Sequence, residues 1–238
     1  NNERAFKNFV LGEGNFTVSY SLDGTTLFGM EDEEGKININ KVDGLILANL
    51  LKDYDNAEEI AASIVAWRSK AAESEEEDYY QGLDLPYHCK NEEFRSVAEL
   101  LLVRGMTPEI LYGEDKDGDG KISEDEQGIA QYLSVFGDDA KVNINTASKK
   151  VLKALIGGTF LGMEVDEVGV LVGKISDYRK GVDGIIGTSD DHWFSIGADT
   201  VELGTGETKE VKNLKASYDA VKDDPFFQVS LVEWEKLQ

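Results

Sequence analysis

The chain has 238 residues, and its 47 acidic and 24 basic residues give a formal net charge of −23. A surface this acidic repels phosphate backbones and anionic lipid head groups, so we expect no nucleic-acid partner. Hydrophobic residues make up 41% of the sequence, which indicates a folded domain rather than a disordered acidic chain. The single cysteine, Cys89, excludes an internal disulfide.

Residues 15–32 alternate apolar and polar side chains, as half-buried strands do, and place Phe16, Val18 and Tyr20 on one face. The pair Asp23-Gly24 in the middle is typical of a tight hairpin turn. The C-terminal part of the chain has a similar composition. Strand-like segments there cover residues 192–203, 209–221 and 226–237. We therefore expect antiparallel strands at both ends of the chain.

Between these ends the apolar residues recur at spacings of three and four, which is typical of helices. They are Leu45, Leu47, Leu50, Leu51, Ile60, Ile64, Trp67, Val97, Leu100, Leu101 and Val103. Thr107-Pro108 predicts a capped helix start, and the acidic run 73–78 is interpreted as a solvated linker. The predicted fold class is α+β, with a helical insert, residues 41–181, that interrupts a body formed by residues 1–40 and 182–238.

The insert contains an internal repeat. The segment 35–40 matches 140–145, the apolar run 45–51 matches 151–156, and the segment 59–68 matches 167–179, so that Trp67-Arg68 recurs as Tyr178-Arg179. A repeated pattern of this kind predicts two copies of one helical unit. The two predicted units span residues 35–70 and 140–181.

Each predicted unit begins with a short strand that ends in an asparagine, Asn40 in the first and Asn145 in the second. Asparagine is a favoured helix cap, so we expect both side chains to cap the helix that follows. The alternative interpretation is that the units are simply two packed helix pairs, because their apolar positions fit the spacing of a core.

A glycine turn follows the apolar segment 94–103, as in helix-hairpin-helix or SAM-like modules. DNA-binding modules of this kind hold a phosphate on the backbone amides at a helix start. Their turn carries two glycines around one apolar residue with basic neighbours, whereas here Gly105 is followed by Met106-Thr107-Pro108-Glu109. In a chain of net charge −23, this turn does not predict nucleic-acid binding.

Residues 115–126 match the twelve-residue EF-hand loop that binds calcium. Calcium takes six to eight oxygen ligands, so carboxylates at alternate positions of a tight loop suit it, and Gly120 permits the sharp turn. Ile122 is expected to pack inward. The predicted ligands are Asp115, Asp117, Asp119, the carbonyl of Lys121, Ser123 and Glu126. Calcium is therefore the expected cofactor.

The loop stands alone, whereas calcium sensors usually pair their EF-hands between long helices. Residues 127–136 suit an exit helix, but the segment from Pro108 to Gly113 is too short for a long entering helix. We therefore expect a calcium ion that fixes a loop rather than one that switches it. A second candidate cation site comprises Asp183, Asp190 and Asp191, and the alternative for it is an ordinary Gly/Asp turn.

Catalytic patterns are not apparent in the sequence. His88 and His192 have no partner that the sequence places beside them, and we find no nucleophile elbow, zinc-ligand cluster or phosphate-binding loop. The chain is therefore not expected to be an enzyme.

Several short motifs in this order resemble the general secretion pathway protein K family, the GspK-type minor pseudopilins of type II secretion. They are Gly35-Lys36-Ile37-Asn38-Ile39-Asn40, Ala66-Trp67-Arg68, Tyr79-Tyr80, Pro86-Tyr87, Phe94-Arg95-Ser96-Val97-Ala98-Glu99-Leu100, Val103-Arg104-Gly105-Met106 and Lys141-Val142-Asn143-Ile144-Asn145-Thr146-Ala147. The likeness extends from about residue 13 to the end. The EF-hand loop looks like an addition to the family pattern.

The resemblance implies a pilin-like antiparallel sheet with a large inserted helical domain and an N-terminal hydrophobic helix that this sequence lacks. It also implies a periplasmic protein, anchored in the inner membrane by that helix, which joins minor pseudopilins I and J at the pseudopilus tip to initiate or cap the filament. Residues 181–191 resemble the calcium loop of the major pseudopilin. The alternative function is a free extracellular calcium-binding module for adhesion or scaffolding.

Overall fold

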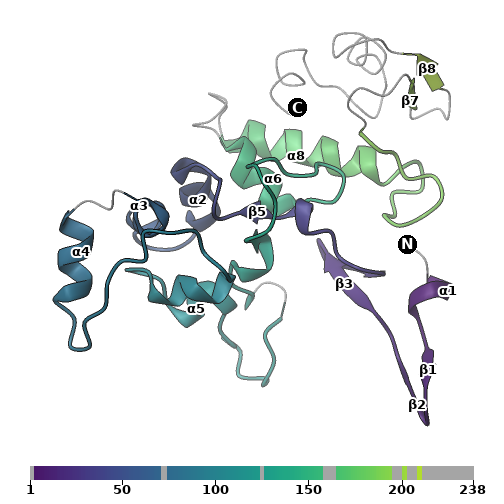
Figure 1. The fold of residues 1–238 in the computed structure, drawn as a ribbon. Helices are drawn as coiled ribbons and strands as arrows, with labels where there is room; N and C mark the ends of the chain where they lie inside the picture. The colour runs from purple at the N-terminus through teal and green to yellow at the C-terminus, as the bar shows by residue number, and fades with distance from the viewer. Residues whose placement is uncertain are drawn as a thin grey trace.

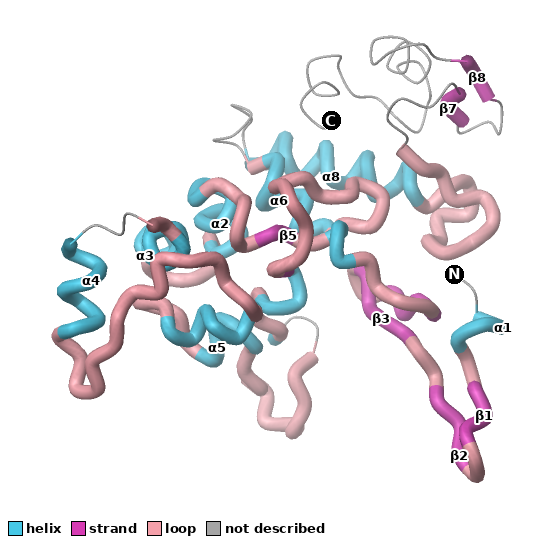
Figure 2. The backbone as a smooth tube through the Cα atoms, in the orientation of Figure 1, coloured by secondary structure: helices cyan, strands magenta, loops and turns pink. Residues whose placement is uncertain are grey.

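The structure, a computed structural model, describes residues 3–70, 74–123, 126–157, 165–194, 200–202 and 208–210. Short helices form the body of the molecule, and hairpins extend from it (Figure 1 and Figure 2). None of the described helices is both long and apolar enough to span a membrane. The mixture of helices with small, mainly antiparallel sheets agrees with the predicted α+β class.

Two hairpins form the N-terminal region. After α1 (Glu3–Phe6), β1 (Phe9–Leu11) pairs with β2 (Gly14–Phe16), and β3 (Ser19–Leu22) pairs with β4 (Thr25–Phe28). The predicted turn at Asp23-Gly24 is confirmed, and both residues have the positive φ of a tight hairpin, 48° and 82°. The alternating segment before this turn is not one strand, because Phe16 lies opposite Phe9 in the first hairpin.

At the C-terminal end the described strands are β7 (Thr200–Glu202) and β8 (Thr208–Glu210), which pair antiparallel. Strand β7 falls within the first predicted strand segment, and β8 overlaps the start of the second. The rest of the second segment and the whole of the third, residues 226–237, lie outside the described residues.

Four helices form the centre of the body. Helix α2 (Gly44–Leu51) packs against α3 (Ala57–Arg68) and α6 (Lys149–Ile156), and α6 packs against α8 (Val165–Arg179). Each aliphatic side chain that is fully buried between them contributes about 1.5–3 kcal/mol to stability. Buried side chains of these helices include Leu47, Leu50, Leu51, Ile60, Ile64, Trp67, Val151, Leu152, Leu171, Val172 and Ile175.

The predicted caps of α2 and α6 are wrong. The amide of Leu45 donates to Oδ1 of Asp43 at 2.8 Å, and the amide of Val151 donates to Oγ of Ser148 at 3.2 Å. Asp43 and Ser148 thus cap the helices, because each directly precedes the first helical residue. The asparagines lie three residues too early.

Asn40 and Asn145 instead hold the backbone of distant residues. Oδ1 of Asn40 accepts from the Phe94 amide at 2.7 Å, and its Nδ2 donates to the Phe94 carbonyl at 3.0 Å. Asn145 repeats both bonds with Phe194, at 2.6 Å and 2.8 Å. We call these pairs the first and the second asparagine clamp. They are the same contact made twice, once in each predicted unit.

The two repeated arginines also make matching contacts. Arg68 donates to the carbonyls of Ile39 and Val42, and Arg179 donates to those of Ile144 and Ala147. Burial lowers the pKa of both guanidinium groups from their ordinary value. The repeat is incomplete, because β5 (Ile37–Asn38) pairs in parallel with β6 (Leu133–Ser134), while residues 141–143 form no strand.

From Ser74 on, the acidic run is a helix and not a solvated linker. In α4 (Ser74–Gln81), Glu76 accepts from the Ser63 hydroxyl at 3.3 Å, and Glu77 accepts from the Cys89 amide at 3.0 Å. Tyr80 is fully buried, with its ring 5.1 Å from that of Trp67. These contacts on one side of α4 therefore hold the helix against the body, although its charge alone would favour solvent.

The chain after Cys89 follows a more irregular path than its apolar spacing indicates. The segment Val97–Leu102 forms η2, a 3-10 helix rather than an α-helix. The predicted cap at Thr107 is confirmed, because its Oγ1 accepts from the Ile110 amide at 3.3 Å at the start of α5 (Pro108–Tyr112). Helix α5 leads directly into the predicted calcium loop.

Asp32 joins the N-terminal region to the second predicted unit. It precedes η1 (Glu33–Gly35), and its Oδ2 accepts from Thr146 Oγ1 at 2.7 Å and from Asn143 Nδ2 at 2.9 Å. The Asn143 amide also donates to the Glu34 carbonyl at 2.7 Å. Although burial raises the pKa of Asp32, these hydrogen bonds outweigh it and lower the pKa from its ordinary value. We call this contact the Asp32 junction.

Candidate metal centre

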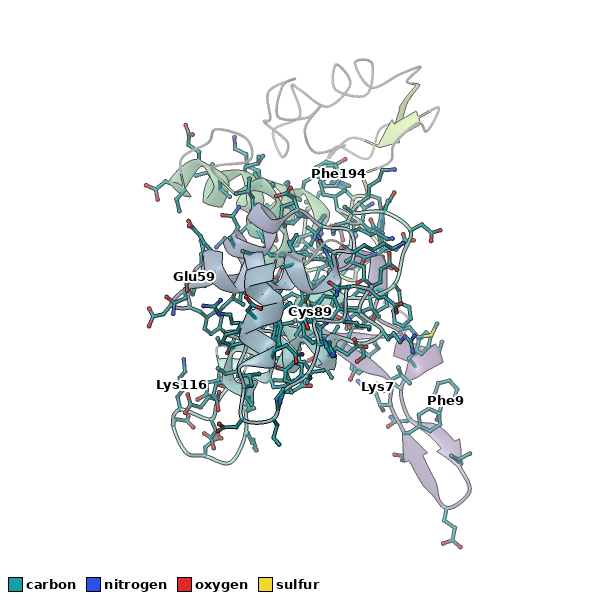
Figure 3. The ribbon with its side chains drawn as sticks, turned by 60° about the vertical axis from the view of Figure 1, so that its left-hand side comes forward. Lys7, Phe9, Glu59, Cys89, Lys116 and Phe194 are labelled. Carbon is teal, nitrogen blue, oxygen red and sulfur yellow. The ribbon has the colours of Figure 1, made fainter. Side chains whose placement is uncertain are left out.

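The predicted calcium loop projects from the body between α5 and η4 (Ala130–Tyr132), and Lys116 marks it in Figure 3. Its two ends are paired at a neck, where Gly113 bridges Gln127 and the Glu114 amide donates to the Glu126 carbonyl at 3.2 Å. The predicted exit helix over residues 127–136 is wrong. That segment pairs with α5 through the neck and then forms η4 and β6, so the chain leaves the loop extended.

Glycine is required at the neck. Gly113 has φ +98°, and a Cβ there would lie 2.1 Å from the Glu126 carbonyl oxygen. A Cβ on Gly128 would lie 2.4 Å from the Leu111 carbonyl oxygen. Two strands of chain therefore cross at a separation that no side chain permits, and this holds the ends of the loop together.

Three of the predicted ligands come together in the structure. Asp115, Asp117 and Glu126 each place a carboxylate oxygen within 4.8 Å of the others. Oxygens bound to one calcium at 2.3–2.6 Å lie up to about 5 Å apart, so this spacing suits a shared ion. Among the described residues, no other group of acidic, histidine or cysteine side chains converges in this way.

Glu126 is the best-fixed of the three carboxylates. It is 7% exposed and accepts from the amides of Lys116, Asp117 and Ser123 at 2.7, 3.2 and 2.9 Å, and from the Ser123 hydroxyl at 2.5 Å. The bond from the Ser123 hydroxyl, together with those from the amides, lowers the pKa of Glu126 to about 2. The carboxylate is therefore charged and oriented at neutral pH.

The carboxylate of Asp115 is also held by backbone amides of the loop. Oδ1 of Asp115 accepts from the amides of Gly118 and Asp119 at 2.7 and 3.2 Å, and its Oδ2 accepts from Gly120 at 2.8 Å. Gly118 and Gly120 have φ of +74° and +83°, which glycine adopts at little cost. The backbone amides thus hold Asp115 in place from one side of the loop.

The remaining predicted residues are placed less centrally. Oδ1 of Asp119 accepts from the Lys121 amide at 2.8 Å, so that side chain folds back on its own backbone and lies outside the group of three. Ile122 does not pack inward, because its side chain is 43% exposed. In this isolated loop it has no second loop of the same kind beside it among the described residues.

The chemistry of the group fits calcium. All the candidate side-chain donors are oxygens, and calcium is a hard cation that prefers carboxylate and carbonyl oxygen. Backbone contacts at the neck close the loop, and this closure brings the oxygens near one another.

The second candidate site is a compact turn. Asp190 accepts from the Val182 and Asp183 amides at 2.8 and 3.0 Å, and Asp191 accepts from the Gly187 amide at 2.6 Å. A bond from the Thr188 hydroxyl to Asp190, at 2.7 Å, is the main reason that its pKa falls to about 2. Asp183, Asp190 and Asp191 are not found as a converging group like that of the first loop. A cation here stays a prediction.

Each of the two histidines contacts a residue that is distant in the sequence. His88 Nδ1 is 2.6 Å from Glu77 Oε1 at the surface, and buried His192 Nδ1 is 3.1 Å from the Tyr178 carbonyl. These partners are up to fourteen residues away in the sequence, so no local motif indicates them.

Comparisons with known proteins give a family match to part of the chain and a similar solved structure. Residues 31–112 match the family model described as type II secretion system (T2SS), protein K. A chain in the crystal structure of the GspK-GspI-GspJ complex from the enterotoxigenic Escherichia coli type 2 secretion system is similar, with 17% identity and a TM-score of 0.41. The similarity covers 60% of this chain and 54% of that chain, so it spans about half of that relative.

No curated protein matches the chain. The family match covers β5, α2, α3, α4, η2 and α5, and it ends just before the candidate calcium loop. It therefore rests on the first predicted unit, with its asparagine clamp and Trp67-Arg68. Residues 31–112 of this chain are therefore similar to the type II secretion system protein K family.

Proposed function

We propose that this chain is a non-enzymatic minor pseudopilin that works in the periplasm, at the tip of the type II secretion pseudopilus, with minor pseudopilins I and J. The observation that carries the proposal is the family match over residues 31–112. A component of this kind acts by binding neighbouring subunits, and its role is to initiate or cap the filament.

The shape of the molecule supports a place at an end of a filament. The packed helices and the projecting calcium loop form a body much broader than the N-terminal hairpins (Figure 1). A subunit with such a side mass hinders the addition of a further copy above it. A head-to-tail contact that is blocked on one side cannot propagate into a fibre, so the assembly has a finite size.

The first test is assembly with the partners. We expect the chain mixed with soluble domains of minor pseudopilins I and J to give a one-to-one-to-one complex in size-exclusion chromatography with light scattering. A specific contact of about −7 kcal/mol is enough to show at tens of micromolar. Long polymers of the chain alone, or no binding to either partner at that concentration, would contradict the proposed function.

We also infer that the loop of residues 115–126 binds one calcium ion through Asp115, Asp117, Asp119, the Lys121 carbonyl, Ser123 and Glu126. The convergence of three carboxylates supports the ion, and the flanking elements support a structural role. Helix α5 has five residues and the exit is extended, so the described residues beside this loop form no long helix pair that could open on binding.

Glu126→Gln should abolish the stabilisation by calcium. The glutamine keeps the shape, but its amide nitrogen cannot bind the ion, and it meets the amide or the hydroxyl of Ser123 as a second donor. In the wild type, Tm should rise with the logarithm of free calcium above the dissociation constant. Differential scanning calorimetry in calcium and in chelator measures this rise.

Glu114→Gln is the matched control, because Glu114 adjoins the loop and is not a predicted ligand. It should keep the full calcium-dependent rise in Tm. If Glu126→Gln also keeps it, the assignment of the calcium ligands is wrong.

A further inference from the structure

The candidate calcium loop continues directly into a strand that belongs to the core of the first predicted unit. Soon after Glu126 the chain forms β6, which pairs in parallel with β5. The Ile39 amide extends this pairing and donates to the Ser134 carbonyl at 2.9 Å. Both residues of β6, Leu133 and Ser134, are buried. The segment that closes the loop at one end is therefore a core strand at its other end.

The first unit holds this exit segment through Asn38 and Asn40. Asn38 is buried, and its Nδ2 donates to the carbonyls of Phe136 and Gly137, both at 3.0 Å. Its Oδ1 accepts from the Asn40 amide at 2.9 Å. Asn40 in turn holds Phe94 in the first asparagine clamp. The exit of the loop and the first clamp are thus joined through two asparagines of the same short segment.

The entering side of the loop is anchored in the same unit. Leu111 in α5 is fully buried, and the Ile110 carbonyl accepts from the Ile129 amide at 3.0 Å across the neck. Helix α5 follows Gly105, where φ is +81° and a Cβ would lie 2.9 Å from Cγ1 of Ile60 in α3. Because both arms of the loop pack on the first unit, a change at the neck is passed on to that unit.

The second asparagine clamp is formed by other parts of the chain. Its bonds join Asn145 to Phe194, and the Phe194 ring lies 4.8 Å from that of Tyr178 in α8. Figure 3 labels Lys116 in the loop and Phe194 in the second clamp, and the two lie at opposite ends of the helical body. The second clamp therefore serves as an internal reference for effects that begin at the loop.

The loop brings like charges together at the neck. The carboxylate oxygens of Asp115, Asp117 and Glu126 lie within 4.8 Å of one another. Like charges at this separation repel, and a divalent cation between them replaces the repulsion by attraction. The Glu126 carbonyl also accepts from the Glu114 amide, which is one of the bonds that close the neck. Repulsion at the Glu126 side chain therefore acts on the backbone that holds the neck together.

We propose that calcium binding to the loop of residues 115–126 strengthens the first asparagine clamp and leaves the second clamp unchanged. The inference rests on the proposed calcium site and names the part of the molecule that this site regulates. Proteins open locally in cooperative units, and the unit that opens here comprises the exit segment, residues 126–137, and the clamp at Phe94. Without the cation, the neck loosens, β6 separates from β5 more often, and Asn40 releases Phe94.

Hydrogen exchange of the full chain, followed by NMR in calcium and in chelator, tests the proposal. The Phe94 amide reports on the first clamp, the Ile39 amide on the pairing of β5 with β6, and the Phe194 amide on the second clamp. In saturating calcium we expect exchange at Phe94 and Ile39 to slow at least tenfold and exchange at Phe194 to stay within twofold. Isothermal titration calorimetry shows separately whether calcium binds.

Asn38→Asp breaks the connection and leaves the predicted calcium ligands in place. The aspartate cannot donate to the Phe136 and Gly137 carbonyls, whereas its oxygen still accepts from the Asn40 amide. We expect this variant to bind calcium in calorimetry but to lose the calcium response at the Phe94 amide. Asn15→Asp in exposed β2 is the matched control and should keep that response. The wild-type measurement stands by itself if Asn38→Asp does not fold.

The possible results separate this inference from the calcium site itself. If calorimetry shows no binding to the wild type, the proposed site fails and the inference fails with it. If calcium binds but exchange at Phe94 and Ile39 is unchanged, the site stands and the inference is wrong. Equal slowing at Phe94 and Phe194 would mean that calcium stabilises the whole chain, which also contradicts the inference. A calcium response at Phe94 that persists in Asn38→Asp rules out the connection through Asn38.

Discussion

Gly113→Ala is expected to open the neck of the candidate calcium loop and to remove the calcium-dependent rise in Tm. The new Cβ would lie 2.1 Å from the Glu126 carbonyl oxygen, 2.8 Å from the Gly128 nitrogen and 2.9 Å from the Gln127 Cα. All three are backbone atoms, which cannot rotate away as a side chain can. Alanine at φ +98° adds about 1–2 kcal/mol of strain. The two effects should lower the free energy of unfolding by about 3 kcal/mol or more.

Gly118→Ala separates these two effects. Gly118 also has positive φ, +74°, but a Cβ there meets nothing within 4 Å. We expect this control to lose only about 1 kcal/mol and to keep a clear calcium-dependent rise in Tm. Urea unfolding with and without calcium measures both quantities. Equal behaviour of the two variants would show that the close crossing at the neck does not hold the loop.

Asn145→Asp should cause the second large loss of stability. Asn145 donates to the Phe194 carbonyl at 2.8 Å through Nδ2, and the aspartate would place an acceptor against that carbonyl. The bond from the Phe194 amide to Oδ1 can persist, so the change isolates one half of the clamp. A part-buried carbonyl that loses its donor and faces a negative charge costs about 2 kcal/mol. The Phe194 ring, 4.8 Å from that of Tyr178, should loosen with it.

Urea denaturation, together with hydrogen exchange at the Phe194 amide, tests this expectation. Asn40→Asp makes the equivalent change in the first clamp and should cost a similar amount, with faster exchange at Phe94 instead. Asn15→Asp in exposed β2 should leave stability within about 0.5 kcal/mol of the wild type. If Asn145→Asp is as mild as Asn15→Asp, the clamp contributes little to stability.

Features that depend on neighbouring residues were predictable from the sequence. The turn at Asp23-Gly24 and the cap at Thr107 need only residues a few positions away, and both are present. The EF-hand pattern likewise specifies ligands by local spacing, and three of them converge. Whether calcium occupies that loop stays a prediction.

Features that depend on distant partners were not predictable in this way. Asn40 and Asn145 have good cap chemistry, but their partners lie 54 and 49 residues away in the sequence. The acidic segment docks as a helix because the Tyr80 ring packs against that of Trp67 and Glu77 accepts a hydrogen bond from the Cys89 amide. The role of Gly113 depends on a close crossing with residues 126–128, which the local sequence does not indicate.

The Asp32 junction also determines how the molecule carries mechanical load. Residues 32–34 are hydrogen-bonded to residues 143–146, so these two short segments fasten the start of the first unit to the start of the second. Tension applied between the N-terminal hairpins and the chain beyond residue 146 passes across these bonds. The intervening residues 36–142, which include the candidate calcium loop and most of the match to protein K, form a closed loop outside that path. Pulling the N-terminal hairpins away from the chain beyond residue 146 should therefore strain the hydrogen bonds of Asp32, Asn143 and Thr146 and leave the candidate calcium loop unloaded.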